Sequence, residues 1–352
     1  MLVPLNLLPQ LFRFLSGARA GRGLRHRFSI IRLLIYRKAF IIYNPYAGKL
    51  RGRAQHFIGR AVGILSEAGH QVEAVPTHGP RTAATVARDC IARGADLLLV
   101  AGGDGTMNEV VNGAVHSDVP VGILPGGTAN VLATELRISK RVENAAKLVS
   151  ECTAERISLG LLRCADAEPR YFALMAGAGL DALIVYKINA KLKSAIGKVA
   201  YWIAGFVHGM RILPEFTVDV AGEQYRSSFA LATRVRNYGG DLEIARDITL
   251  LENDFEVVLF EGVNPLRYVK YLTAVLLGKT AGLKGVTVLR TDRLEVSSPE
   301  DRRIYIQVDG EYAGRLPAAI EIVPNCLSLL IPPQFVTRAF DRDRTWTTSP
   351  TR

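Results

Sequence analysis

The sequence predicts an α/β protein: an N-terminal domain with a parallel sheet, followed by a second domain rich in antiparallel β-structure. Three observations lead to this prediction. Strand-like and helix-like segments alternate regularly from Ala39 to about Ser150. Glycine-rich turns follow two of these strands, at 102–105 and 125–127. Beyond Ser150, strand-like segments succeed one another without a helix between each pair.

The first domain is expected to contain strands at Ala39–Tyr43, Gln71–Pro76, Leu97–Ala101 and Val121–Leu124. Helices are expected at Arg53–Ala68, Thr82–Arg93, Asn108–Val115 and from about Val131. Four polar residues each follow one of these strands: Asn44, Thr77, Asp104 and Thr128. Because parallel strands end at the same edge of a sheet, we expect these side chains to converge there.

The second domain is expected to contain mostly short strands bounded by Gly, Pro or Asp. They are predicted at Tyr171–Met175, Glu215–Val220, Phe229–Thr233, Phe255–Phe260, Gly285–Leu289, Leu294–Ser297 and Tyr305–Val308. Helical insertions are predicted at Asp181–His208 and Pro265–Leu277. We therefore place domains at 39–152 and 153–322, and a frayed polar tail at 341–352.

Positive charge is concentrated at the N-terminus. The formal net charge is +11, and residues 1–66 hold twelve Lys or Arg and no Asp or Glu. Within 1–38, apolar residues recur at helical spacing: Leu7, Leu8, Leu11, Phe12 and Leu15. This basic amphipathic extension is typical of peripheral contact with an anionic membrane. A disordered extension, a start codon assigned too far upstream and an Arg-rich presequence remain alternatives.

Other classes of protein fit less well. The four cysteines lie far apart without a CxxC pair, which argues against a disulfide framework and a zinc site. No apolar run reaches the ~18 residues of a spanning helix. The positive charge is terminal and lacks interleaved aromatic residues, so we expect no nucleic acid partner. The predicted location is the cytoplasm, with peripheral membrane association.

The run GGDGTMNE at 102–109 points most directly to function. It turns a buried strand into a helix through three glycines, which let a backbone approach phosphate closely. The helix N-terminus adds N–H donors and a partial positive charge. Asp104 lies inside this turn, where a divalent cation would explain a carboxylate beside phosphate. A plain structural turn would not need Thr106, Asn108 and Glu109 as well.

Two further motifs follow the same logic. PGGTAN at 125–130 pairs two glycines with Thr128 and Asn130 at a helix start. VDGE at 308–311 places Asp309 and Glu311 at the end of a strand. By itself each motif is also compatible with an ordinary turn.

Together, NPYAG, GGDGTMNEVVNG, PGGTANVLA and VDGE resemble the diacylglycerol kinase catalytic-domain family, from about Ala39 to Pro332. Its bacterial members are soluble lipid kinases, and sphingosine and ceramide kinases are relatives. The resemblance implies ATP in a cleft between an α/β and a β-rich domain. It also implies that the chain end returns to the first domain, which 323–340 would complete.

Carried over by motif, the resemblance implies ATP binding by Asn44, Pro45, Tyr46, Ala47, Gly48, Thr77, Gly103, Asp104, Gly105, Thr106, Met107, Asn108, Glu109, Gly127 and Thr128. Glu311 would accept the proton during catalysis, with Asp309 and Asp104 in a Mg²⁺ network. A second metal site is implied near Glu252, but Asn253 stands there in place of the family's glycine. Val131 also differs from the family pattern, since many members have Asp at that position.

The resulting prediction is an ATP-dependent lipid kinase that acts on diacylglycerol or a similar lipid alcohol, with ATP and Mg²⁺ as cofactors. An NAD kinase-like enzyme and a catalytically silent nucleotide- or lipid-binding protein are the alternatives. The second alternative would need a damaged set of acids, yet Asp104, Glu109, Asp309 and Glu311 are all present. The sequence leaves a homodimer open.

Overall fold

The computed structural model describes residues 35–187, 213–238, 242–276, 282–299 and 303–336. Residues 1–34 of the predicted N-terminal extension lie outside these ranges, as do the predicted C-terminal tail and the predicted helix beyond Lys187. None of the described helices is both long and apolar enough to cross a membrane.

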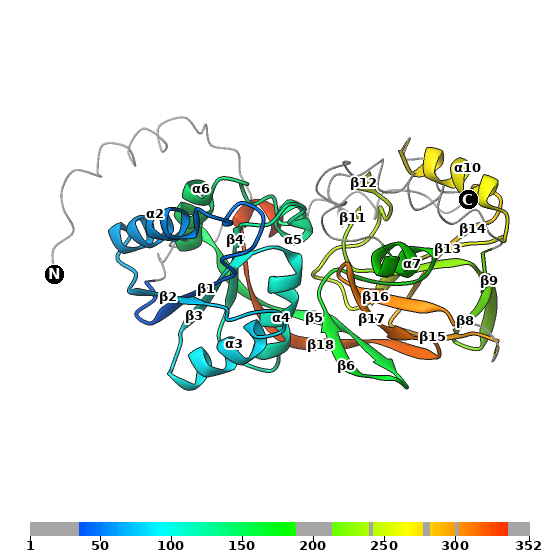
Figure 1. Cartoon of the computed structure of the whole chain (residues 1–352), viewed down its shortest axis with the longest axis horizontal. Coiled ribbons are helices and arrows are strands. Elements are labelled where there is room, and N and C mark those ends of the chain that lie inside the picture. Colours follow the sequence, from blue (N-terminus) through cyan, green and yellow to red (C-terminus); the bar gives the residue numbers. More distant parts are fainter. Residues whose placement is uncertain (1–34, 188–212, 239–241, 277–281, 300–302, 337–352) are drawn as a thin grey trace, which may run out of the picture. The chain divides into compact units, whose positions relative to one another are not determined.

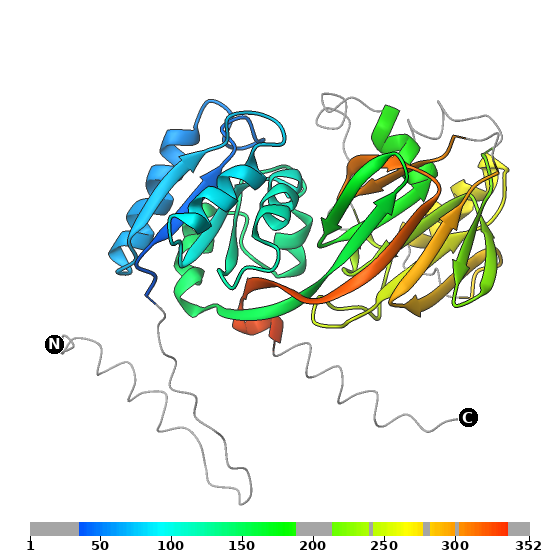
Figure 2. The same cartoon turned by 90° about the horizontal axis from the view of Figure 1, so that it is seen from below.

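The first lobe is the predicted alternation of strands and helices (Figure 1). Its elements are β1 (Ala39–Tyr43), α2 (Ala54–Glu67), β2 (Val72–Pro76), α3 (Ala83–Ala92), β3 (Leu97–Gly102), α4 (Asp104–Ala114), β4 (Val121–Pro125), α5 (Val131–Glu135), α6 (Val142–Leu148) and η2 (Val149–Glu151). The strands pair in parallel in the order β2-β1-β3-β4. The helices α2 and α6 pack together, as do α3 and α4, and the two pairs lie on opposite faces of the sheet (Figures 1 and 2). Strands covered on both faces explain the unbroken apolar run of β3.

The parallel sheet continues into the second lobe through two long strands, β5 (Thr153–Cys164) and β18 (Ala318–Ile331). Near its end β18 runs parallel to β4, with Leu329 opposite Val121. It also pairs antiparallel with β5 along most of its length. The end of the described chain therefore returns to the first sheet. The predicted domain boundaries at 152 and 322 stay a prediction, because β18 continues across position 322 without a break.

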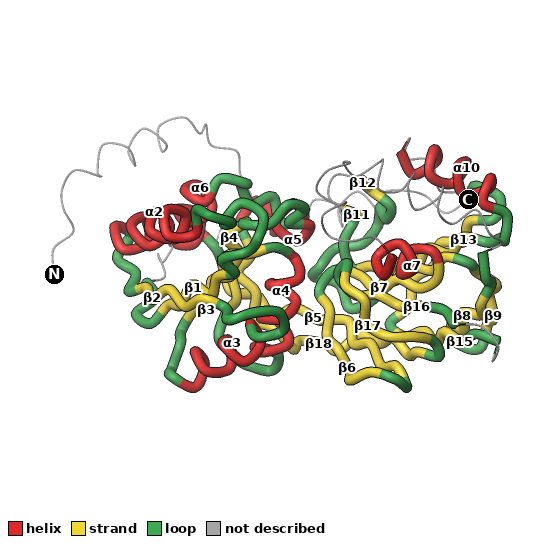
Figure 3. Tube along the Cα trace, in the orientation of Figure 1, coloured by secondary structure: helices red, strands yellow, loops and turns green. Residues whose placement is uncertain are grey.

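The second lobe is rich in strands (Figure 3), and most of them pair antiparallel. Its remaining elements are β6 (Ala167–Phe172), β7 (Met175–Gly179), α7 (Leu180–Lys187), β8 (Phe216–Val220), β9 (Glu223–Ser227), β10 (Phe229–Thr233), β11 (Asn237–Tyr238), β12 (Leu242–Glu243), β13 (Phe255–Phe260), α10 (Pro265–Leu276), β14 (Val286–Thr291), β15 (Arg293–Ser297), β16 (Tyr305–Val308) and β17 (Glu311–Arg315). One sheet has the order β14-β13-β10-β7-β16-β17. Its inner face packs on the β5, β8, β15 and β18 side of the other sheet around buried Phe172, Phe216 and Phe255. This confirms the fold class predicted from the sequence.

One predicted strand was wrong. The apolar stretch Tyr171–Met175 suggested a single strand, but β6 ends at Phe172 and β7 begins at Met175. The reason is that the backbone N–H groups of Ala173, Leu174 and Met175 donate to the side chain of Asp309. A local apolar pattern cannot reveal an acceptor that lies more than a hundred residues away.

The helix α4 also begins earlier than the predicted Asn108. It starts at Asp104, directly after the extended residue Gly103, so part of the glycine turn is already helical. This places the first turn of α4 at the carboxyl end of β3.

A buried carboxylate ties α5 to the β11–β12 hairpin. Glu135 is 8% exposed and accepts hydrogen bonds from the Asn237 side chain (2.7 Å) and the Arg236 backbone N–H (3.2 Å). Burial raises the pKa of Glu135, and the Asn237 hydrogen bond opposes that shift. The carboxyl group is thus held between two parts of the chain and is easier to protonate than in water.

We expect α3 and α4 to tolerate no methyl group at their closest approach. A Cβ on Gly113 would lie 2.9 Å from both Ala84 Cα and Ala87 Cβ. Gly113→Ala should therefore lower the free energy of unfolding by about 1–3 kcal/mol, although alanine has the better helix propensity. The matched control is Gly59→Ala in α2, where nothing lies within 4 Å and a small gain is expected. Urea unfolding followed by circular dichroism measures the free energy of unfolding of both variants. Equal changes in Gly113→Ala and Gly59→Ala would contradict the close approach of α3 and α4.

We also expect Glu135→Gln to change how stability depends on pH. Because the folded-state pKa is raised, this group stabilises the fold most when protonated, and that contribution is lost as pH rises above the unfolded value of about 4.3. The advantage of Glu135→Gln over wild type should grow as pH rises through that window. Unfolding free energies measured across pH test this, and a constant difference would contradict it.

Candidate active site

Three loops meet at the carboxyl ends of β1, β3 and β4. The backbone N–H of Lys49, after the first loop, donates to the Gly126 carbonyl (2.9 Å), and Gly126 N–H donates to the Gly102 carbonyl (2.9 Å). A Cβ on Gly103 would lie 3.4 Å from Gly127 Cα, and one on Gly48 would lie 3.1 Å from Thr128 Oγ1. The loops approach so closely because glycines stand at each contact. The structure thus brings together NPYAG, GGDGT and PGGTAN.

Asn44 joins the first two loops through its carboxamide. Its Oδ1 accepts from the Tyr46 N–H (2.9 Å), and its Nδ2 donates to Thr106 Oγ1 (3.4 Å). Thr77 follows β2 and is buried, and its N–H donates to the Tyr43 carbonyl (2.8 Å). Tyr46 is the most open of these residues, with 69% of its surface exposed. The polar residues predicted after the strands therefore gather at one sheet edge.

A glycine turn and a helix N-terminus meet at these loops. Gly103 is half-buried, and α4 begins beside it with the half-buried Asp104 as its first residue. Gly127 is buried, and its backbone N–H and carbonyl both hydrogen-bond the Asn130 side chain. The first turn of a helix presents N–H groups that lack intrahelical partners, and its dipole favours an anion. The wall that this turn forms can bind phosphate through the backbone without a positively charged side chain.

Three of the predicted nucleotide ligands, all in the second half of GGDGTMNE, are buried or have other partners. Met107 and Asn108 are buried, at 5% and 1% exposure. The carboxylate of Glu109 accepts from the backbone N–H groups of Arg81 (3.0 Å) and Ala83 (2.8 Å), at the start of α3. These contacts assign packing and capping tasks to the second half of GGDGTMNE. They do not support direct contact with a nucleotide.

Asp309 lies in the tight turn between β16 and β17, with a left-handed φ of 49°. Its Oδ1 accepts from the N–H groups of Leu174 and Met175 (both 3.0 Å). Its Oδ2 accepts from the Ala173 N–H (3.1 Å) and Asn108 Nδ2 (2.8 Å). Burial raises the pKa of Asp309, and these four donors oppose the shift.

The predicted role of Asp309 as a magnesium ligand therefore does not fit. An ionised carboxylate has about four acceptor positions, and four hydrogen bonds already use them. Asp309 instead fixes the β6–β7 connection and α4 to the β16–β17 turn.

Glu311 begins β17 and faces the GGDGT turn. Its Oε1 lies against Gly105, so that a Cβ on Gly105 would overlap the carboxylate. Its Oε2 accepts from Arg170 Nη2 at 2.5 Å. The side chain is 42% exposed, which leaves it open to a substrate. The structure thus places the predicted proton acceptor next to the first turn of α4.

The second predicted metal position, Glu252, has a guanidinium partner. Arg290 forms ion pairs with Glu252 and with Asp254 and donates to the Asp247 carbonyl (2.6 Å). A metal ion would have to displace this guanidinium, so the arrangement weighs against a metal at Glu252. Within the described ranges, no three His, Cys, Asp or Glu side chains gather to hold a metal ion. A divalent ion would depend on phosphate oxygens for part of its coordination.

Two site residues were missed from the sequence. Arg170 of β6 donates to both Glu311 and Asn108, and Asn112 of α4 binds the backbone of Tyr171 through its carboxamide. Asn112 lies within GGDGTMNEVVNG, so that motif was the one signal that could have indicated it. Arg170 neither follows a strand nor stands in a glycine turn, so no local pattern separates it from surface residues.

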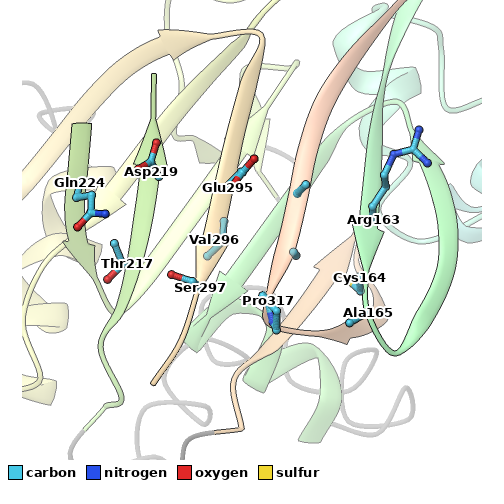
Figure 4. Close-up of a pocket in the computed structure, with 12 residues that line it drawn as sticks. Arg163, Cys164, Ala165, Thr217, Asp219, Gln224, Glu295, Val296, Ser297 and Pro317 are labelled. Atoms are coloured by element: carbon cyan, nitrogen blue, oxygen red, sulfur yellow. The ribbon is translucent and has the colours of Figure 1, made fainter. Parts of the chain in front are cut away.

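A cavity of about 550 Å³ lies elsewhere, on the second lobe (Figure 4). It is lined by polar side chains such as Arg163, Thr217 and Glu295, from the face of β5, β8 and β15 opposite to the core. It includes none of the residues of the three loops, so it is separate from the candidate active site.

Comparison with known proteins agrees with this geometry. Residues 38–162 match the diacylglycerol kinase catalytic domain, and residues 175–331 match the YegS C-terminal NAD kinase beta sandwich-like domain. A crystal structure of a diacylglycerol kinase from Bacillus anthracis has the same fold, with a TM-score of 0.69 and 19% identity over 85% of this chain and 98% of that one.

Curated relatives match over most of their length. The diacylglycerol kinase of Bacillus subtilis is 28% identical over 291 residues, 80% of this chain and 92% of the relative. A diacylglycerol kinase of Staphylococcus epidermidis is 30% identical over 291 residues, 80% of this chain and 88% of the relative. The chain belongs to the diacylglycerol kinase family.

Proposed function

We propose that this chain transfers the terminal phosphate of ATP to the hydroxyl of diacylglycerol or a similar lipid alcohol. The observation that carries the proposal is the position of Glu311. Its carboxylate lies against Gly105 in the first turn of α4, at the edge where the three loops meet. A proton acceptor beside a phosphate-binding wall is what phosphoryl transfer to an alcohol requires.

The residues would share the work as follows. The loop backbones at Gly48 and Gly103 and the exposed Thr128 would hold the phosphates, with the N-terminus of α4 favouring their charge. Glu311 would accept the proton of the lipid hydroxyl while the hydroxyl oxygen attacks the terminal phosphorus of ATP. The bond from that phosphorus to the oxygen that bridges it to ADP breaks, and ADP leaves. Asp104 would help to hold a magnesium ion that accompanies ATP, and such an ion would neutralise phosphate charge during transfer.

The family comparison and the acids present favour a lipid kinase over an NAD kinase-like enzyme and over a catalytically silent binding protein. The relatives named diacylglycerol kinase match about four fifths of this chain, which includes both lobes. The match to an NAD kinase-like sandwich concerns the second lobe alone. The acids that a silent homologue would have lost are present, and Glu311 is oriented toward the loops. Peripheral membrane contact would bring the enzyme to such a substrate.

We expect Glu311→Gln to lower kcat for lipid phosphorylation by about 10²–10⁴-fold, because the proton acceptor is lost while the shape is kept. Asp104→Asn should lower it as well, by weakening the Mg²⁺ network. Labelled ATP incubated with a panel of lipid alcohols and resolved by thin-layer chromatography measures both variants against wild type. Near-normal turnover in both would exclude the proposed mechanism.

We expect Asp309→Asn to act on the fold as well as on turnover. Its amide nitrogen would face N–H donors in a buried turn, which should cost about 2–4 kcal/mol of unfolding free energy. Glu311→Gln is the matched control, because its side chain is half exposed and its loss should leave the thermal midpoint unchanged. If Asp309→Asn is as stable as wild type, the four hydrogen bonds to the Asp309 carboxylate are not needed for the stability of the fold.

A further inference from the structure

Arg170 touches two parts of the candidate active site at once. It comes from β6, and its Nε donates to Asn108 Oδ1 (2.8 Å) while its Nη2 donates to Glu311 Oε2 (2.5 Å). Its side chain is 24% exposed, against 42% for Glu311. The cation is therefore more enclosed than the carboxylate that it holds.

The ion pair determines which oxygen of Glu311 remains available. Arg170 engages Oε2, and Oε1 lies against Gly105 in the first turn of α4. A glutamate side chain has three rotatable bonds and would otherwise sample several positions. A guanidinium that is itself fixed limits these positions by holding Oε2 in place.

Arg170 is fixed from the buried side. Asn108, which accepts from Arg170, donates through Nδ2 to Asp309 Oδ2 (2.8 Å) and to the Tyr171 carbonyl (3.0 Å). A chain of contacts thus runs from buried Asp309 through Asn108 and Arg170 to half-exposed Glu311. Arg163 of the neighbouring strand β5 differs: it pairs with Glu321 at 3.2 Å on the surface and reaches no site residue.

We propose that Arg170 is a positioning residue that holds Glu311 against the phosphate-binding turn and leaves one carboxylate oxygen for the proton of the substrate. This inference rests on the proposed function, because only phosphoryl transfer gives Glu311 the role of proton acceptor. Arg170 then acts through Glu311 and not through the nucleotide.

A double-mutant cycle tests this role. Wild type, Arg170→Gln, Glu311→Gln and the double variant are assayed for transfer from labelled ATP to diacylglycerol in mixed micelles. We expect Arg170→Gln to lower kcat by about 10–100-fold with less than about 3-fold change in the KM for ATP. In the Glu311→Gln background the same change should cause no further loss, because its effect passes through the missing carboxylate.

Controls separate positioning from folding. Arg163→Gln should keep wild-type kinetics, since it removes only a surface ion pair. Arg170→Lys keeps the charge without the planar fork and should retain part of the activity that Arg170→Gln loses. It also serves as the test variant in the same cycle if Arg170→Gln does not fold, as judged by its thermal midpoint.

The outcomes distinguish this inference from the proposed function. Equal losses of kcat in both backgrounds, or a raised KM for ATP at unchanged kcat, overturn the positioning role while the lipid kinase activity stands. A folded wild-type chain that transfers no phosphate to any lipid alcohol overturns the proposed function, and the positioning role with it.

Discussion

The buried carboxylate of Asp309 is the contact on which the candidate site depends. Removing a carboxylate from water costs several kcal/mol unless donors replace the solvent. Here four donors do so, three from the backbone at 173–175 and one from Asn108 on α4. A hydrogen bond to a charged group contributes about 1.5–3 kcal/mol, so the four offset part of the burial cost, although burial still raises the pKa of Asp309. The contact joins α4, the β6–β7 connection and the β16–β17 turn, and it sets where Glu311 begins β17.

The GGDGTMNE segment divides into two parts with different tasks. Gly103, Asp104 and Gly105 form the wall that faces the other loops and Glu311. Asn108 and Glu109 point to Asp309 and to the start of α3. The second part lies one helical turn further along α4 than the first. A short motif can therefore bind a ligand and hold its own scaffold together.

Arginine takes a structural role where the resemblance implied a metal ion. Arg290 pairs with Glu252 and Asp254, and Arg234 donates through Nη2 to the carbonyls of Leu250 and Glu252 (both 2.8 Å). Arg234 is fully buried, and burial lowers its pKa to about 10, so it is still charged at neutral pH. The guanidinium groups of Arg234 and Arg290 thus bind the 250–254 loop through directed hydrogen bonds.

The sequence by itself determined the fold class, most elements of the first lobe and the convergence of the three loops. These follow from periodicity, from glycine at turns and from the rule that parallel strands end at one sheet edge. Only the tertiary structure decided which residues of the motifs face outward, where β6 ends and what Arg170 holds. Those outcomes depend on contacts between residues far apart in the chain, such as Asn108 with Asp309 and Arg170 with Glu311. A local pattern reports the periodicity of its own segment, and a buried hydrogen bond between distant segments leaves no trace in it.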